Sequence, residues 1–214
     1  VPDLPGWGEN AATLTPYEAT GWGSMDRLHA YVSYGNGDGV LALLARIVAA
    51  TADEVSRRTS LPQERTILIG SGLGGTVALL AAAVCATPVR VASVSSLGSF
   101  RMLTDEEFYS WPSISFLPDA LNAFDLPELV SSLRAQGRRV LIADPRDGAG
   151  HPLSQERAVG LFGETDTYAY PPAEGETEAV RGAEAAPPTA TRRTPSVGSL
   201  LAEFTDEVAR GELP

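Results

Sequence analysis

The sequence predicts an α/β fold, a parallel sheet flanked by helices, with a flexible acidic tail at the C-terminus. The main observation is residues 66–85, in which a short apolar run, a glycine-rich turn and a long apolar run follow one another. An apolar strand without polar alternation is typical of the interior of a parallel sheet, and a helix that is apolar on every side is buried. Two further apolar runs, residues 89–94 and 139–143, predict two more buried strands.

The segment before this unit predicts a loop and a helix. Residues 10–35 carry scattered aromatic side chains without a sustained period, which predicts a long ordered loop over the core, with His29 in it. From Asp38 onward apolar residues recur at helical spacing, so we expect an amphipathic helix that ends near Arg57 and Arg58. These two cations complement the negative end of the helix dipole.

The segment after the second strand is less regular. Residues 95–122 are rich in aromatic residues, serine and proline, and a short helix is expected at residues 105–110. Asp125 has the position of an N-cap, and the helix that follows should run to about Ala135 and stop at Gly137.

The third predicted strand leads into another helix. Ser154 caps a helix expected over residues 155–162, and residues 167–170 are predicted as a final strand. The sequence thus predicts four strands of a parallel sheet.

The C-terminal part differs in composition. Residues 171–195 are dominated by Pro, Ala, Glu, Gly and Thr, which predicts a flexible linker. Residues 196–210 regain helical spacing and are expected to form a helix that docks on a partner surface. The predicted organisation is a domain over 1–170, the linker, and a C-terminal helix and tail over 196–214.

The composition excludes several classes of site. The net charge of −11 leaves no basic footprint for nucleic acid, and the sixteen basic residues are all Arg, which excludes any chemistry that needs a lysine. Cys85 is the only cysteine and is expected to be a small core residue. Only His29 and His151 supply imidazoles, too few for a histidine-rich metal centre, so the sequence predicts no metal centre and no cofactor.

The chain is also expected to be soluble. Its longest apolar run, residues 77–84, is far too short to cross a membrane, and residues 1–3 do not resemble the start of a signal peptide. We therefore expect no membrane partner and no signal peptide, and the compartment stays open.

The glycine turn supports three interpretations. Glycines at Gly70, Gly72 and Gly75 match the dinucleotide pattern G-x-G-x-x-G. Glycines at Gly70 and Gly74 match the nucleophile elbow G-x-S-x-G, with Gly72 in place of the serine. The third interpretation is that the glycines only let a helix and a strand pack closely.

The dinucleotide interpretation expects an acidic residue at the end of the second strand to bind ribose hydroxyls. That strand is followed by Ser95 and Ser96, and the nearest acids, Asp105 and Glu106, lie beyond a further loop. The dinucleotide interpretation is therefore less well supported, but it stays open.

Over about residues 1–170 the chain resembles the α/β-hydrolase superfamily, and within it acetylxylan-esterase-like members. The resemblance rests on the turn at residues 3–9, the glycine turn, the Asp-Leu-Pro at 125–127 and the loop at 144–154. It implies Asp147 as the triad acid with Asp144 second, and the Leu73 amide as oxyanion donor. It also implies a small ester-like or anionic ligand, near these further residues: Ser71, Gly74, Asp144 and His151.

The chain departs from that pattern at three points. Gly72 has no hydroxyl, residues 171–178 contain no histidine where the triad histidine belongs, and the segment that would supply a second oxyanion donor is not present. We therefore expect a catalytically degenerate domain with a binding or assembly role. The alternatives are an ester hydrolase that needs a missing N-terminal part or protein partner, a triad rescued by Ser71 and His151, and a dinucleotide-binding module.

The resemblance also makes a geometric prediction. Gly72 and Asp147 both follow parallel strands, so they should lie on the same edge of the sheet. Without a histidine partner, Asp147 should accept hydrogen bonds from backbone amides or pair with an arginine such as Arg146.

Overall fold

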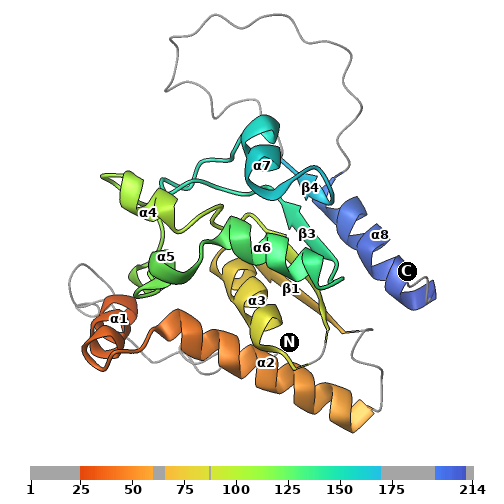
Figure 1. The fold of residues 1–214 in the computed structure, drawn as a ribbon, viewed down its shortest axis with the longest axis horizontal. Coiled ribbons are helices and arrows are strands. Elements are labelled where there is room, and N and C mark those ends of the chain that lie inside the picture. Colours follow the sequence, from red (N-terminus) through yellow and green to blue (C-terminus); the bar gives the residue numbers. More distant parts are fainter. Residues whose placement is uncertain (1–24, 60–65, 87, 170–195, 211–214) are drawn as a thin grey trace, which may run out of the picture.

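A four-stranded parallel sheet forms the centre of the molecule (Figure 1). The computed structural model describes residues 25–59, 66–86, 88–169 and 196–210. The strands are β1 (Ile67–Ser71), β2 (Arg90–Val94), β3 (Val140–Ala143) and β4 (Thr167–Tyr168), and they lie in that order across the sheet. The predicted α/β class and all four predicted strands are therefore present.

The strands differ in burial, and this corrects one expectation. Every residue of β2 and β3 is buried, as a strand between two neighbours in a covered sheet requires. β1 pairs only with β2 among the described residues, and it is partly exposed along its length. The sequence predicted β1 as an interior strand, whereas it lies at the edge of the described sheet.

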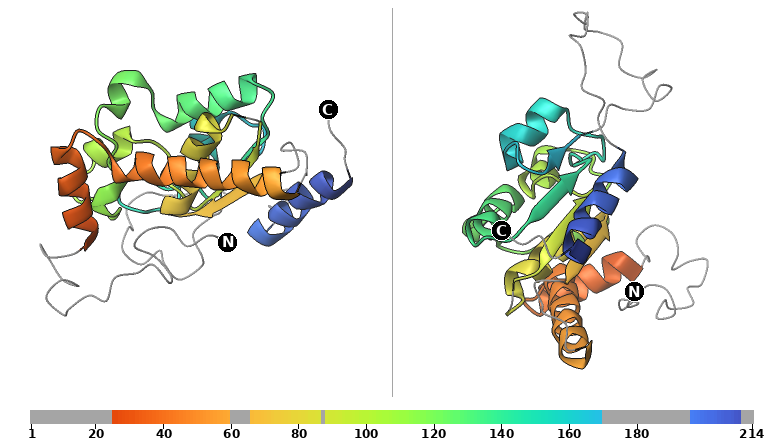
Figure 2. Two further views of the ribbon diagram at one scale, coloured as in Figure 1. Left: turned by 90° about the horizontal axis from the view of Figure 1, so that it is seen from below. Right: turned by 90° about the vertical axis from the view of Figure 1, so that its right-hand side faces the viewer.

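One face of the sheet is covered by a layer of helices (Figures 1 and 2). The layer contains α2 (Val40–Thr59), α3 (Leu73–Val84), α6 (Leu126–Ala135) and α7 (Gln155–Phe162). Their apolar side chains share one core with Val91, Val140 and Ile142 of the strands. Cys85, as predicted, is a buried member of this core, and burial is the main cause that raises the pKa of its thiol.

The other face is covered by α8 (Val197–Arg210) (Figure 2). Leu200 and Phe204 are buried against Ala92 and Leu141, which point to this face because successive strand residues alternate between faces. The guanidinium of Arg139 lies 5.0 Å from the centre of the Phe204 ring. The helix was expected on a partner surface, but its apolar side packs on the sheet of its own chain.

The remaining elements precede α2 or connect β2 to α6. They are α1 (Met25–Gly35), α4 (Arg101–Asp105), the 3₁₀ turn η4 (Ser113–Ser115) and α5 (Ala120–Ala123). Two expectations are corrected here. Residues 25–35 are helical instead of loop, and the short helix ends at Asp105 instead of covering residues 105–110. The predicted linker, residues 1–24 and the tail after Arg210 lie outside the described residues.

Two of the helices begin and end as predicted because their caps are local. Asp125 forms a capping box with Glu128, and Ser154 accepts a hydrogen bond from the Arg157 amide at the start of α7. Gly137 follows α6 with a φ of 76°, a conformation that glycine adopts without steric cost.

The Asp125 carboxylate joins two helices. It accepts hydrogen bonds from the Leu126 amide at 2.7 Å, the Phe100 amide at 2.6 Å and the Ser99 hydroxyl at 2.5 Å. One carboxylate therefore caps α6 and holds the chain at the start of α4, which explains why α4 begins at Arg101.

We expect Asp125→Ala to lower the free energy of unfolding by about 2–4 kcal/mol, more than the loss of an ordinary N-cap, because several buried donors lose one acceptor. Ser154→Ala is the matched control, with an expected loss of about 1 kcal/mol. Urea unfolding followed by circular dichroism measures both. Equal losses would contradict a joining role for Asp125.

Tyr34 fastens α1 to the turn at η4, where its hydroxyl donates to the carbonyl oxygens of Ser113 and Phe116, both at 2.8 Å. Burial, and then the nearby Tyr109 and Tyr31, raise the pKa of Tyr34 to about 12. Because this folded-state pKa lies above that of an unfolded tyrosine, its contribution to stability is complete below about pH 10.

We therefore expect the free energy of unfolding to fall as pH rises from about 10 to 12, as Tyr34 is forced to ionise. In Tyr34→Phe that part of the fall should disappear, because no proton is lost at this position. Unfolding curves at pH 8 to 12 test this, and an unchanged alkaline slope in the variant would exclude Tyr34 as its source.

Candidate functional site

The glycine turn joins β1 to α3 in a sharp bend. Gly72 is the N-cap of α3, with φ 57° and ψ −126°, and its own amide donates to the carbonyl of Val94 at 2.9 Å. The amide of Gly75 donates to the carbonyl of Gly72 at 3.0 Å and so closes the first turn. A strained strand-to-helix bend of this kind is the geometry that a nucleophile elbow requires.

The four glycines of this turn have different reasons to be glycine. A Cβ at Gly70 would lie 2.0 Å from the carbonyl oxygen of Gly74, and a Cβ at Gly75 would lie 2.6 Å from the hydroxyl of Ser93. A Cβ at Gly72 or Gly74 would meet nothing within 4 Å. Close packing therefore explains Gly70 and Gly75, the positive φ explains Gly72, and Gly74 is under neither constraint.

The ends of three neighbouring strands share an unusual backbone. Gly72, Ser95 and Asp144 directly follow β1, β2 and β3, and their φ angles are 57°, 48° and 54°. For a serine or an aspartate this left-handed conformation is strained, and such strain gathers at functional or tightly held sites. Ser95 was not among the predicted site residues, because a serine with positive φ leaves no signature in the sequence.

The structure brings Gly72 and the loop that contains Asp147 to the same edge of the sheet. Both follow the carboxyl ends of parallel strands, and only β2 lies between β1 and β3. Two strand spacings correspond to about 10 Å across the sheet. The expected placement on one edge is therefore correct.

Asp144 is a structural anchor at the centre of this edge. Its carboxylate is nearly buried and accepts hydrogen bonds from the Ser95 hydroxyl at 2.7 Å and from Arg146 at 2.9 Å. These bonds hold the strained ends of β2 and β3 together. Of the two kinds of partner expected for Asp147, an amide or an arginine, Arg146 is not the one, because it pairs with Asp144.

Asp147 closes its own loop. Its side chain accepts a hydrogen bond from the backbone amide of His151 at 2.8 Å, which is the expected amide contact. The imidazole of His151 lies 3.6 Å from the second carboxylate oxygen, and the side chain of His151 is 77% exposed. No hydrogen bond joins His151 to Ser71 among the described side chains, so the structure does not assemble the rescued triad.

A neighbouring loop is fastened to this one. The indole of Trp111 donates to the carbonyl of Asp147 at 2.8 Å, and Ser110 bonds through its amide to Gly148 at 2.9 Å and through its hydroxyl to Ala149 at 2.5 Å. The backbone of the Asp147 loop is therefore held by three hydrogen bonds from this neighbouring loop.

The chemistry available at this edge is limited. Leu73 and Gly74 present backbone amides at the positive end of α3, beside the open space at Gly72, and Ser71 is exposed next to them. Neither histidine side chain is hydrogen-bonded to a hydroxyl in the described part, where His29 lies exposed on α1. The roles predicted for Leu73, Ser71 and Gly74 stay predictions.

No metal centre is formed by the residues that the structure describes, where no three metal-ligating side chains gather into one group. In the same residues, no helix has the length and apolarity that a membrane crossing needs. The chain matches no protein-family model, no curated protein and no solved structure.

The four glycines give a graded test of the turn. We expect Gly70→Ala to cost at least about 3 kcal/mol of stability because its methyl group meets backbone atoms. Gly72→Ala should cost about 1–3 kcal/mol through its backbone conformation alone. Gly74→Ala should be neutral or stabilising by up to about 1 kcal/mol, because the helix gains a better helix former. Urea unfolding measures the series, and a different order would contradict the turn geometry.

Proposed function

We propose that this chain is a catalytically degenerate α/β-hydrolase-like domain that binds a small anionic or ester-like ligand at the carboxyl edge of its sheet. The observation that carries the proposal is Gly72, which has the strained backbone of an elbow but no side chain to attack a carbonyl group. The place of the side chain is open space, next to backbone amides that attract negative charge.

The position of Asp147 supports the same proposal. It follows β3 on the edge that Gly72 occupies, where the resemblance to α/β-hydrolases expects the triad acid. Its carboxylate bonds to an amide within its own loop instead of orienting an imidazole toward Gly72. A triad-acid position without its histidine partner fits a domain that binds a ligand but does not hydrolyse it.

Acetate is a direct probe of the claim that a small anion binds at the turn. We expect acetate to shift the amide resonances of Leu73 and Gly74 more than others, because these amides are the free donors beside the open space. Gly72→Ala should weaken binding at least about threefold by filling that space. Gly160→Ala, on α7 and also without a neighbour within 4 Å, is the matched control.

An assay of 4-nitrophenyl acetate hydrolysis tests the claim that the domain has lost catalysis. The unmodified chain should show no turnover above buffer, and Gly72→Ser should show none either, because no imidazole is placed to take the proton of the hydroxyl. Turnover by the unmodified chain that is lost in Asp147→Ala would show a working triad acid and overturn the proposal.

A second candidate is an ester hydrolase that a separate N-terminal part completes. The open outer edge of β1 favours it, because a larger sheet would continue there. Ester hydrolysis should then appear only when that N-terminal part is restored. If no hydrolysis is measured after restoration, this candidate function is excluded.

A further inference from the structure

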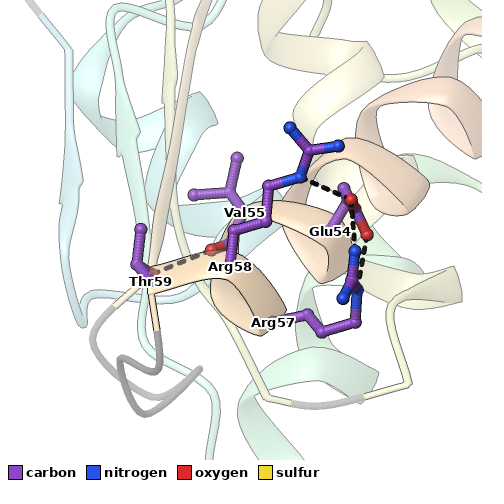
Figure 3. A network of polar contacts seen from close by, with 5 residues as sticks. All are labelled: Glu54, Val55, Arg57, Arg58 and Thr59. Carbon is purple, nitrogen blue, oxygen red and sulfur yellow. Dashed lines mark hydrogen bonds and ion pairs between the residues drawn. The ribbon is translucent and has the colours of Figure 1, made fainter.

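The arginine side chains near the amino end of the sheet are generally held by acceptors. At the end of α2, Glu54 accepts hydrogen bonds from both Arg57 and Arg58 at 2.6 Å (Figure 3). Arg134, which is half-buried at the end of α6, donates to the carbonyl oxygen of Val140 at 3.0 Å. Such partners are expected, because a guanidinium group taken out of water is costly unless acceptors replace the water.

Arg90, the first residue of β2, differs from these arginines. It is only 7% exposed, and its Nη1 atom is buried without a hydrogen-bond partner. No carboxylate of the described residues forms an ion pair with it. Burial, and then the neighbouring Arg139, lower the pKa of Arg90, because both disfavour its charged form. Native proteins leave few buried polar groups unpaired, so this group requires an explanation.

Arg139 lies beside Arg90 on the same face of the sheet. The residues that directly follow these two arginines are partners in the register of β2 and β3, so the arginines are neighbours across the two strands. Ala92 and Leu141 pack against α8. Because residues two apart in a strand share a face, both arginine side chains are directed to the side of the sheet that α8 covers.

The carboxylate nearest to this pair is used by Arg139. Asp166 accepts from Nε and Nη2 of Arg139 at 2.9 and 3.4 Å, and Phe204 of α8 lies over the same guanidinium. The printed bonds to the Asp166 carboxylate come from Arg139 alone. The positive charge of Arg90 therefore has no carboxylate partner in the part of the chain that the structure describes.

We propose that Arg90 and Arg139 form a binding site for a small oxyanion, of the class of inorganic phosphate, at the amino end of the sheet beside α8. A planar guanidinium presents parallel N–H donors that match the oxygens of such an anion. The anion would give Arg90 both an acceptor and a compensating charge. This inference does not depend on the proposed function, which concerns the carboxyl end of the sheet.

The surroundings favour a small, doubly charged anion. α8 contacts Ile67, the register partner of Arg90, and buries Leu200 and Phe204 against the sheet. A ligand much larger than one phosphate group would have to displace these side chains. A phosphate ion also carries more charge and more acceptor oxygens than acetate, so it can bridge two guanidinium groups where acetate serves one.

Thermal unfolding at constant ionic strength tests the site, with sodium chloride, acetate and phosphate compared near neutral pH. About 20 mM phosphate should raise the Tm by at least about 2 °C over chloride, because it binds the folded state alone, and acetate should raise it less. Arg90→Met should abolish the rise. In chloride its Tm should equal or exceed that of the unmodified chain, because an unpaired buried charge is replaced by an apolar side chain.

The matched control is Arg101→Met, the same substitution at an exposed arginine on α4, which should keep the full rise with phosphate. A second variant, Arg90→Lys, retains the charge but not the planar fork. It should weaken phosphate binding at least about threefold.

NMR of the arginine side chains locates the anion in the unmodified chain. Phosphate should shift the Nε–Hε resonances of Arg90 and Arg139, and that of Arg101 should stay where it is. This measurement needs no variant, so it decides the inference even if Arg90→Met does not fold.

Four results would overturn the inference. Three of them are no rise in Tm with phosphate, an equal rise in Arg90→Met, and a shift at Arg101 as large as the shift at Arg90. The fourth is a Tm of Arg90→Met in chloride that is lower by more than about 5 °C, which would show that a carboxylate of the chain already pairs with Arg90. Glu64→Gln, in the segment before β1, would then lower the Tm to the same extent if Glu64 is that partner.

Discussion

The close contact between α3 and the β1–β2 pair sets the geometry of the whole carboxyl edge. The helix approaches so closely that side chains at Gly70 and Gly75 would overlap backbone or serine atoms. This approach leaves little length for the connection, so the chain must turn within Gly72, at a backbone conformation other residues adopt only under strain. The amides at the start of α3 are directed outward for the same reason. The elbow-like geometry is thus a consequence of helix–strand packing and does not need a nucleophile to maintain it.

The remainder of the edge is held by carboxylates that serve the fold. Asp144 joins Ser95 to Arg146, Asp125 joins two helices, and Asp147 closes its own loop. Each carboxylate accepts hydrogen bonds from groups that hold the fold, and none is bonded to a side chain of the glycine turn among the described residues. Residues that resemble catalytic acids by position therefore hold the loops in place.

The sequence predicted elements whose determinants are local. Residues 126–135 and 155–162 are helical as expected, since Asp125 and Ser154 cap them within one turn. Elements that depend on distant contacts were missed: α1 is held by the Tyr34 hydroxyl on η4, and α4 begins where Asp125, 24 residues away, meets its first amides. The position of α8 could not be predicted, because an apolar stripe does not specify the surface it covers. In the candidate site, the edge that Gly72 and Asp147 share could be predicted from the strand order. The pairing of Arg146 with Asp144, and the hydrogen bond from Ser95 to Asp144, depend on side-chain geometry that the sequence does not specify.

β1 links the two unusual features of this chain. Its end leads into the strained turn at Gly72, and its outer side pairs with no strand among the described residues and exposes Ile69. A strand with a neighbour on one side only is generally less protected than one with neighbours on both sides, because fewer of its backbone groups are bonded within the sheet. Ser71 directs its backbone groups to that open edge and directly precedes Gly72. The order of the turn, and of the Leu73 and Gly74 amides beside it, therefore depends on how firmly Ser71 is held.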